Sequence, residues 1–303
     1  MLKGIGAWIG GLLVIGCVRV RLLLPEGASR RLAEALGWTA SLLLPGRRRV
    51  VDRNLRRAFP DRSDADRARL AAGFYAGTAG WFFEMLLLFR EGRDRNLQRY
   101  RIEGAEHLRA ALALGRGVIG VSAHVGPFAG LGTAVASLGV PFSFLYRRPK
   151  EVRIARLFDD WLDRSGARII ADAPRQTAGL RCLHALARGE LICLLADQHF
   201  PAGIEVPFFG HPSKTGIGAA LLAVRSGAPL LPLRATRQPD GGVLVRIDPP
   251  MDPPADRTRE SLAATTAALA SRIESWIRED PAGWFWIHRR WKDLDRMEAE
   301  RGG

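Results

Sequence analysis

The sequence predicts an α/β fold, a layered and largely parallel sheet with flanking helices, preceded by a helical N-terminal region. From about residue 98, short apolar runs alternate with helical stretches, an order typical of α/β domains with parallel strands. Before that point apolar residues recur at helical spacing, and the segments stop at prolines. We therefore predict an anchor with amphipathic helices over residues 1–92 and an α/β domain over residues 93–303, joined as one integrated unit.

The N-terminal region divides into four segments. Residues 4–18 carry no charge, but fifteen residues fall short of the roughly 20 that span a bilayer. We expect an anchor that lies in, or dips into, the inner leaflet, with a buried core helix as the alternative. The arginines that follow favour keeping this side cytoplasmic. Helices are expected at residues 29–44, at 47–59, which is basic and amphipathic and suits a membrane surface, and at 61–89.

The α/β region is read from its apolar runs. Strands are expected at residues 117–123, 142–146, 167–171, 191–196, 229–234 and 243–248. Helices are expected at residues 129–138, 151–164, 175–188, 215–227 and 257–279. This alternation of strands and helices is what places the ends of several parallel strands at one edge of the sheet.

The charge of the chain indicates an anionic partner. Lys and Arg number 45 against 31 acidic residues, and residues 1–60 carry eleven basic and three acidic residues. Such an excess suits a membrane surface, nucleic acid or a phosphorylated substrate, or simply a solvated arginine-rich surface. The charge lies on amphipathic helices beside an apolar segment, and we recognise no nucleic-acid-binding module, so we expect a membrane partner and no nucleic acid.

Several kinds of site are excluded by their missing motifs. The sequence has no G-x-S-x-G elbow, no P-loop and no complete G-x-G-x-x-G, which argues against serine hydrolases, P-loop enzymes and dinucleotide enzymes. The three cysteines show no paired spacing, so we expect reduced thiols, no disulfide framework and no metal site.

Two apolar strands end in residues that suit catalysis. His124 follows the run at 118–123, and Asp197 and Gln198 follow the run at 191–196. Since ligands of open α/β sheets bind at the carboxyl ends of strands, we expect these side chains to converge. The alternatives are a core or capping histidine and an aspartate that only caps a turn. Gln198, and Lys214 in the polar loop that follows, are expected to bind substrate.

Two clusters of cations are also candidates. Arg147, Arg148 and Lys150 follow a strand, where they suit phosphate recognition better than a solvated face. Near the C-terminus, cations alternate with tryptophans, as expected for side chains at membrane headgroup depth, although a packed C-terminal helix would show the same pattern. This interfacial group comprises Trp284, Trp286, Arg289 and Arg290, with Trp291 and Lys292 beside them.

The residues and the order of several sequence blocks resemble those of the bacterial lipid A late acyltransferases. These form the lauroyl/myristoyl family of the lysophospholipid acyltransferase-like superfamily. The blocks are "NLRRAFPD", "SAHVGPFAGLG", "YRRPK", "LLADQHF", "VPFFGHPSKTGIGAALLAVRSGAPLLP" and "PAGWFWIHRRWK". The resemblance implies an enzyme at the cytoplasmic face of the inner membrane. It would move a fatty acyl chain from a thioester, usually on acyl-carrier protein but otherwise on acyl-CoA, to a hydroxyl of a lipid A precursor or related glycolipid. No metal or redox cofactor is implied.

The family's catalytic motif is a histidine followed five positions later by Asp or Glu, and this chain departs from it. His124 matches the histidine, whereas the acidic position holds Ala129. In one interpretation Asp197 orients the imidazole, with three other aspartates as weaker candidates. In a second, His124 acts alone at a reduced rate. In a third, the chain is a non-catalytic relative that binds lipid or a partner enzyme. The weaker candidates are Asp159, Asp160 and Asp172.

Overall fold

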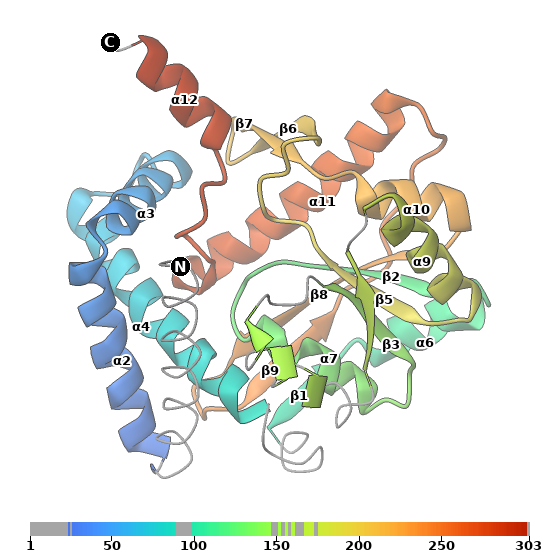
Figure 1. Ribbon diagram of the computed structural model, residues 1–303, viewed down its shortest axis with the longest axis horizontal. Coiled ribbons are helices and arrows are strands. Elements are labelled where there is room, and N and C mark those ends of the chain that lie inside the picture. Colours follow the sequence, from blue (N-terminus) through green and yellow to red (C-terminus); the bar gives the residue numbers. More distant parts are fainter. Residues whose placement is uncertain are drawn as a thin grey trace.

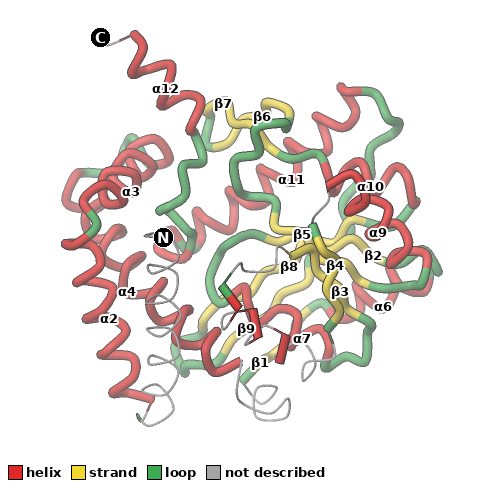
Figure 2. The backbone as a smooth tube through the Cα atoms, in the orientation of Figure 1, coloured by secondary structure: helices red, strands yellow, loops and turns green. Residues whose placement is uncertain are grey.

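A seven-stranded sheet forms the centre of the protein, with helices around it (Figures 1 and 2). The computed structural model describes residues 24, 26–88, 99–146, 151–152, 155–156, 159–160, 167–172 and 175–301. The strand order is β1-β9-β8-β2-β5-β3-β4. The strands are β1 (Tyr100–Glu103), β2 (Val118–Ser122), β3 (Phe142–Tyr146), β4 (Arg168–Ala171), β5 (Leu191–Leu195), β8 (Leu230–Arg237) and β9 (Val243–Ile247).

The prediction of a largely parallel sheet is confirmed. Strands β8, β2, β5, β3 and β4 all run parallel to one another, which requires crossover connections between them. The exception is β9, which pairs antiparallel with β8 because only residues 238–242 connect the two strands. Strand β1 then adds parallel to β9 at the edge.

Helices cover both faces of the sheet. They are α2 (Glu26–Leu43), α3 (Pro45–Ala58), α4 (Asp64–Leu88), α6 (Ala105–Ala113), α7 (Leu131–Ala136), α9 (Arg175–Ala187), α10 (Gly218–Ser226), α11 (Arg259–Glu279) and α12 (Lys292–Arg301). Alternation along β2 shows the two faces: Val118 packs in the cluster that includes α6 and α7, and Ile119 packs in the cluster that includes α9 and α10. Of the helix expected at 151–164, a part lies outside the described residues.

Two elements of the fold do not follow from apolar runs. Strand β1 is short and exposes every second residue. Strands β6 (Ile204–Phe208) and β7 (His211–Thr215) form a separate hairpin, and each contains a proline, which argues against a strand when only the sequence is read. This hairpin packs on α11 and helps to enclose the site described below.

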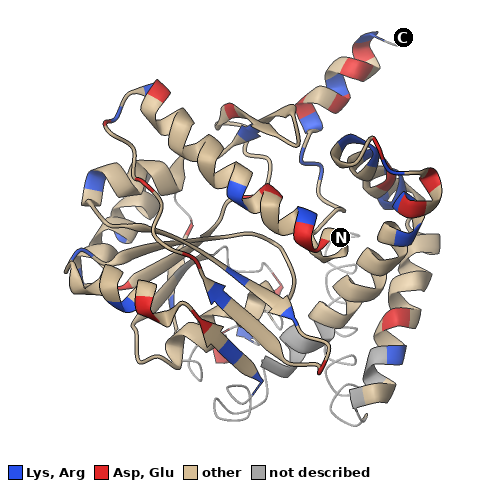
Figure 3. Ribbon diagram, turned by 180° about the vertical axis from the view of Figure 1, so that it is seen from behind, with Lys and Arg blue, Asp and Glu red and all other residues tan. Residues whose placement is uncertain are grey.

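The N-terminal helices pack on the α/β part through an aromatic core. Leu55 of α3, Phe59 directly after it and Phe74 of α4 share a buried cluster with Trp276 of α11 and Trp284. Figure 3 shows Lys and Arg crowded on α3. Among the described helices, none combines the length and the apolar character needed to cross a bilayer. The expected anchor at residues 4–18 lies outside the described residues.

Candidate active site

The register of two parallel strands brings His124 and Asp197 together. Ser122 of β2 pairs with Leu195 of β5, so each candidate residue stands two positions beyond the last pair. The backbone keeps this alignment past the strands, because Ala196 N–H donates to the Ser122 carbonyl at 2.9 Å. The sequence prediction that these strand ends converge is therefore confirmed.

The two side chains form a close pair. His124 Nδ1 lies 2.8 Å from Asp197 Oδ1, and the backbone N–H of His124 donates to Asp197 Oδ2 at 3.1 Å. The carboxylate is buried, with 2% of its side chain exposed, whereas 20% of the imidazole remains exposed. One edge of the ring is thus held by the protein, and the ring is still open to a substrate.

A segment near the C-terminus closes around this pair. Gly126 N–H donates to the Gly283 carbonyl at 2.8 Å, and Phe285 N–H donates to the His124 carbonyl at 3.1 Å. Between these bonds, the indole N–H of Trp284 donates to Asp197 Oδ2 at 2.7 Å. The carboxylate therefore accepts from a backbone amide, an indole and the imidazole.

These contacts set the ionisation of the pair. Burial opposes ionisation of Asp197, but the charge and hydrogen bond of His124 and the bond from Trp284 outweigh it and lower its pKa to about 2. For His124, burial lowers the pKa. The charge and the hydrogen bond of Asp197 outweigh this effect, so the pKa of His124 is raised above its usual value. Since an ionised carboxylate only accepts, Nδ1 of His124 carries the proton and Nε2 of the neutral ring is a proton acceptor.

The free edge of the imidazole faces Gln198 and two aromatic rings. The Gln198 amide nitrogen lies 3.3 Å from His124 Nε2. The ring of Phe128 packs edge-on at 4.8 Å, and that of Phe285 lies at 6.0 Å. A substrate hydroxyl that reaches Nε2 would replace the amide of Gln198 in this apolar setting.

Arg290 holds the loop that carries Asp197 and Gln198 through hydrogen bonds. Its guanidinium is fully buried and donates to the Gln198 carbonyl at 2.9 Å and to Thr215 Oγ1 at 2.6 Å. It also donates to the carbonyl of Lys214 at 3.3 Å. Burial lowers its pKa to about 10, so Arg290 stays charged at neutral pH.

A second set of interacting polar side chains includes His199, which follows Asp197 and Gln198 in the sequence. His199 Nε2 contacts Asp293 at 3.1 Å, and Lys214 Nζ lies 3.5 Å from the same carboxylate. His288 Nε2 accepts from the backbone N–H of His199 at 3.0 Å, and burial lowers the pKa of His288 to about 4. Lys214 therefore stands beside the loop that follows β5, paired with Asp293. Among the described residues, no three His, Cys, Asp or Glu side chains are grouped to hold a metal ion.

The prediction of an interfacial group is wrong for three of its four residues. Trp284, Trp286 and Arg290 are all fully buried, and Trp291 is buried beside them. The reason is that each polar tip has a partner inside the protein: Trp284 bonds Asp197, Trp286 bonds the Pro281 carbonyl, and Arg290 bonds the loop after β5. Of the four residues predicted to lie at the interface, only Arg289 is exposed. The cations Arg147, Arg148 and Lys150 lie outside the described residues.

Asn54 is a residue of this site that sequence reasoning missed. It is buried in α3, and its amide donates to the carbonyls of Trp286 and His288, each at 2.8 Å. The N-terminal helices thereby hold the segment that supplies Trp284. A polar residue within the otherwise apolar face of this helix was the only signal in the sequence.

The position of the missing motif carboxylate is apolar. Ala129 lies in the short 3-10 turn Phe128–Gly130 and packs against the sheet cluster that contains Leu131 and Val135. A Cβ at its neighbour Gly130 would lie 1.9 Å from the Tyr100 hydroxyl oxygen, so a side chain there would require the Tyr100 ring to move. Asp197, from the next strand of the sheet, is the carboxylate that contacts the imidazole.

Comparison with known proteins agrees with this arrangement. The sequence profile of the bacterial lipid A biosynthesis acyltransferases matches residues 2–293. The chain belongs to this family. It is therefore an acyltransferase, and the resemblance carried by its sequence blocks is confirmed.

Several known proteins are similar to this chain. The chain is 28% identical to the lipid A biosynthesis lauroyltransferase of Escherichia coli K12, over 94% of this chain and 90% of the relative. It is 31% identical to the phosphatidylinositol mannoside acyltransferase of Mycobacterium tuberculosis H37Rv, over 68% and 64%. A crystal structure of the 1-acyl-sn-glycerophosphate acyltransferase from Thermotoga maritima is similar at 16% identity and a TM-score of 0.39, over 82% of this chain and 97% of that one.

Proposed function

We propose that this acyltransferase moves a fatty acyl chain from a thioester, on acyl-carrier protein or acyl-CoA, to a hydroxyl of a lipid A precursor or a related glycolipid. The relatives named for lipid A and for phosphatidylinositol mannoside support a glycolipid acceptor. The observation that carries the proposal is the 2.8 Å contact between His124 Nδ1 and Asp197, which leaves Nε2 as a proton acceptor.

His124 acts as the general base. A hydroxyl is a weak nucleophile, so Nε2 takes its proton as the oxygen attacks the thioester carbonyl. Asp197 holds the imidazole in the required tautomer and stabilises the imidazolium that forms. When the tetrahedral intermediate collapses, the thiol of the donor leaves with that proton. In this scheme Asp197 does the work that the motif carboxylate does elsewhere in the family.

The remaining site residues are assigned to substrate. Gln198 lies where it can bind the acceptor hydroxyl beside Nε2. Lys214 and the cations Arg147, Arg148 and Lys150 are proposed to bind phosphate on the donor or the lipid.

We also propose that the enzyme works at the cytoplasmic face of the inner membrane. Helix α2 exposes a group of apolar side chains directly before the arginines that begin α3. Apolar side chains beside cations suit an anionic bilayer surface. The exposed apolar residues of α2 are Leu36, Trp38, Leu42 and Leu43, and Leu44 between α2 and α3 is exposed beside them.

The test is acyl transfer by two variants, measured with an acyl-carrier-protein thioester and a lipid A precursor. His124→Ala should abolish transfer, and unchanged transfer would exclude every mechanism in which His124 is the base. Asp197→Asn should be nearly as damaging, because it keeps the shape but loses the charge. A silent Asp197→Asn would assign the imidazole's orientation to another group.

A further inference from the structure

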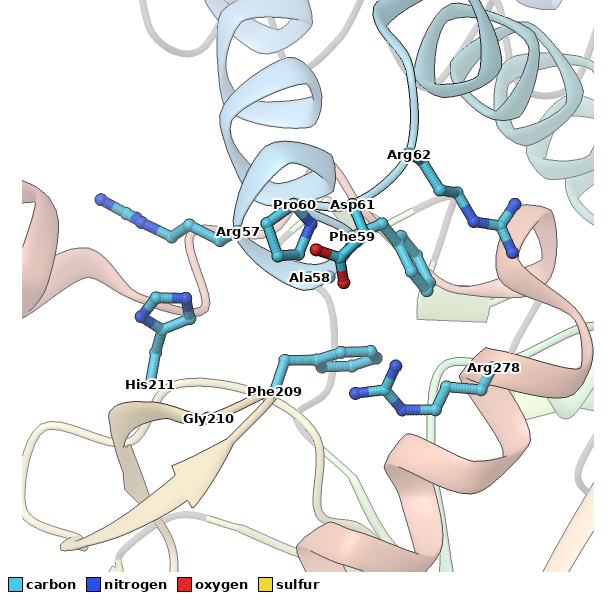
Figure 4. A pocket seen from close by; sticks show the side chains of 10 residues that line it. All are labelled: Arg57, Ala58, Phe59, Pro60, Asp61, Arg62, Phe209, Gly210, His211 and Arg278. Carbon is cyan, nitrogen blue, oxygen red and sulfur yellow. The ribbon is translucent and has the colours of Figure 1, made fainter.

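A pocket of about 500 Å³, shown in Figure 4, has neither His124 nor Asp197 among its lining residues. It is formed by the end of α3 with the turn that follows, by the turn between β6 and β7, and by the last turn of α11. Its lining includes Arg57, Phe59, Asp61, Arg62, Phe209 and Arg278. A volume of this size suits a small ligand or a headgroup.

Buried aromatic rings separate this pocket from the imidazole. Phe59 and Phe209 form its floor, and their centroids lie 5.8 and 6.4 Å from that of Trp286. Trp286 is fully buried and packs at 4.6 Å on Trp284, which in turn bonds Asp197. A ligand in this pocket would therefore not contact the catalytic pair.

Two guanidinium groups stand over the floor. The Arg62 guanidinium lies 4.8 Å from the centroid of Phe59, and that of Arg278 lies 4.6 Å from the centroid of Phe209. Within the described chain, no carboxylate forms an ion pair with Arg62. The carboxylate paired with Arg278 is that of Glu274, 3.7 Å away, which is beyond a normal hydrogen bond. Both guanidinium groups can therefore donate hydrogen bonds to an anion that enters the pocket.

Arg57 differs from these two cations. Its guanidinium is mostly buried and is held by Asp295 and Glu298 of α12. It forms a wall of the pocket and is not counted as a ligand group.

The floor is held in an unfavourable backbone conformation. Phe209 has a φ of 51°, and it is the one non-glycine residue with positive φ in the described chain. With Gly210 it forms the two-residue turn between the paired residues Phe208 and His211, a turn that favours Asn-Gly. The carboxylate of Glu274 accepts from Phe209 N–H at 2.6 Å and holds the turn. The ring is thus fixed at this place although the backbone disfavours it, a feature that often marks a functional position.

We propose that this pocket binds a phosphate ester that carries an adjoining apolar group. Arg62 and Arg278 bind the phosphate oxygens, because guanidinium donors match them in geometry and charge. Phe59 and Phe209 contact the apolar part. Asp61 also lines the pocket and accepts from a hydroxyl of the ligand, which favours an ester of a polyol over a bare anion. Both a phospholipid headgroup and a soluble phosphate ester have this chemistry.

The experiment measures binding by the full chain in two arms. Hexanoylglycerol 3-phosphate, a soluble phosphate ester with a short apolar chain and a free hydroxyl, is titrated by calorimetry, and phosphatidylglycerol vesicles are compared with phosphatidylcholine vesicles by cosedimentation. The variant is Arg62→Gln with Arg278→Gln. The matched control is Arg69→Gln with Arg296→Gln, which removes two exposed arginines that lie outside the pocket. We expect the pocket variant to bind about tenfold more weakly or worse, and the control to bind within about twofold of the wild type.

The arms also identify the source of the ligand. A loss confined to vesicles assigns the pocket to a lipid headgroup, and a loss in the calorimetric arm assigns it to a soluble ester. Equal weakening by both double variants, or no binding by the wild type in either arm, overturns the proposal. His124→Ala should bind as the wild type does, so this result is independent of whether His124 is the base.

Discussion

The indole N–H of Trp284 donates to Asp197 Oδ2 across 2.7 Å, although the two residues are 87 positions apart in the sequence. This bond ties the carboxylate that orients His124 to the C-terminal segment. The same carboxylate accepts from the His124 backbone, so its two oxygens are fixed from both sides. A tryptophan that sequence patterning assigns to a membrane interface is thus part of the support of the proposed catalytic pair.

Trp284→Phe should lower acyl transfer by about tenfold, because Asp197 loses one donor while remaining buried. Trp286→Phe is the matched control, since its indole donates to the Pro281 carbonyl at 2.6 Å and does not contact the pair. We expect the two variants to lose similar thermal stability, measured by calorimetry, and only Trp284→Phe to lose activity beyond that. Equal activities would show that the bond to Asp197 is only structural.

The pH dependence of transfer should report His124. A general base must be unprotonated, so kcat/KM rises as the pH rises through the pKa of His124, which Asp197 places above the usual value of about 6.5. In Asp197→Asn the charge that raises the pKa is gone while burial still lowers it. The inflection should then move to lower pH, and kcat should fall by roughly 10⁴.

The measurement is kcat/KM across the neutral range for the wild type and Asp197→Asn. An inflection that stays in place would show that Asp197 does not act on the imidazole. The sign is opposite for stability: the raised pKa of His124 stabilises the fold below about pH 6.5, and this contribution is lost as the pH rises through the raised pKa. The lowered pKa of Asp197 stabilises the fold above about pH 3.8, and that contribution is lost as the pH falls towards 2.

The sheet could be predicted because its strands are continuous apolar runs, and the pairing of His124 with Asp197 followed from parallel strand ends. The strands that were missed lack this signal. Strand β1 exposes every second residue, and β6 and β7 each contain a proline. A buried strand is a local pattern, whereas a small hairpin depends on the surface that it packs against.

The C-terminal block could not be placed from the sequence for a different reason. Tryptophans that alternate with cations suit both a bilayer interface and a core with a buried arginine. Which of the two forms depends on distant partners, here Asn54 of α3, Asp197 after β5 and Thr215 of β7. These partners are brought together only by the completed fold.

Two substitutions of Arg290 should distinguish the effect of its positive charge from the effect of its planar hydrogen-bonding shape. Arg290→Met leaves the buried carbonyl of Gln198 and the hydroxyl of Thr215 without this donor, at a cost of about 1–3 kcal/mol for each. Arg290→Lys keeps the charge but not the planar fork. We expect both variants to unfold at lower denaturant concentration, with Lys the milder, and kcat to fall more than KM rises. A variant with normal kcat would show that the loop after β5 holds its place without Arg290.

Restoring a carboxylate at position 129 tests whether Asp197 has fully taken over the role of the missing motif residue. Ala129 packs against the apolar sheet cluster, so Ala129→Glu must bury a charge there or push the turn outward. Ala129→Gln has the same size without the charge and serves as the control. If Asp197 has taken over the role, Ala129→Glu should lose activity and stability more than Ala129→Gln does, in transfer assays and denaturant unfolding. A strong gain of activity in Ala129→Glu alone would instead mean that Asp197 supports His124 only weakly, because a second carboxylate could then improve the base.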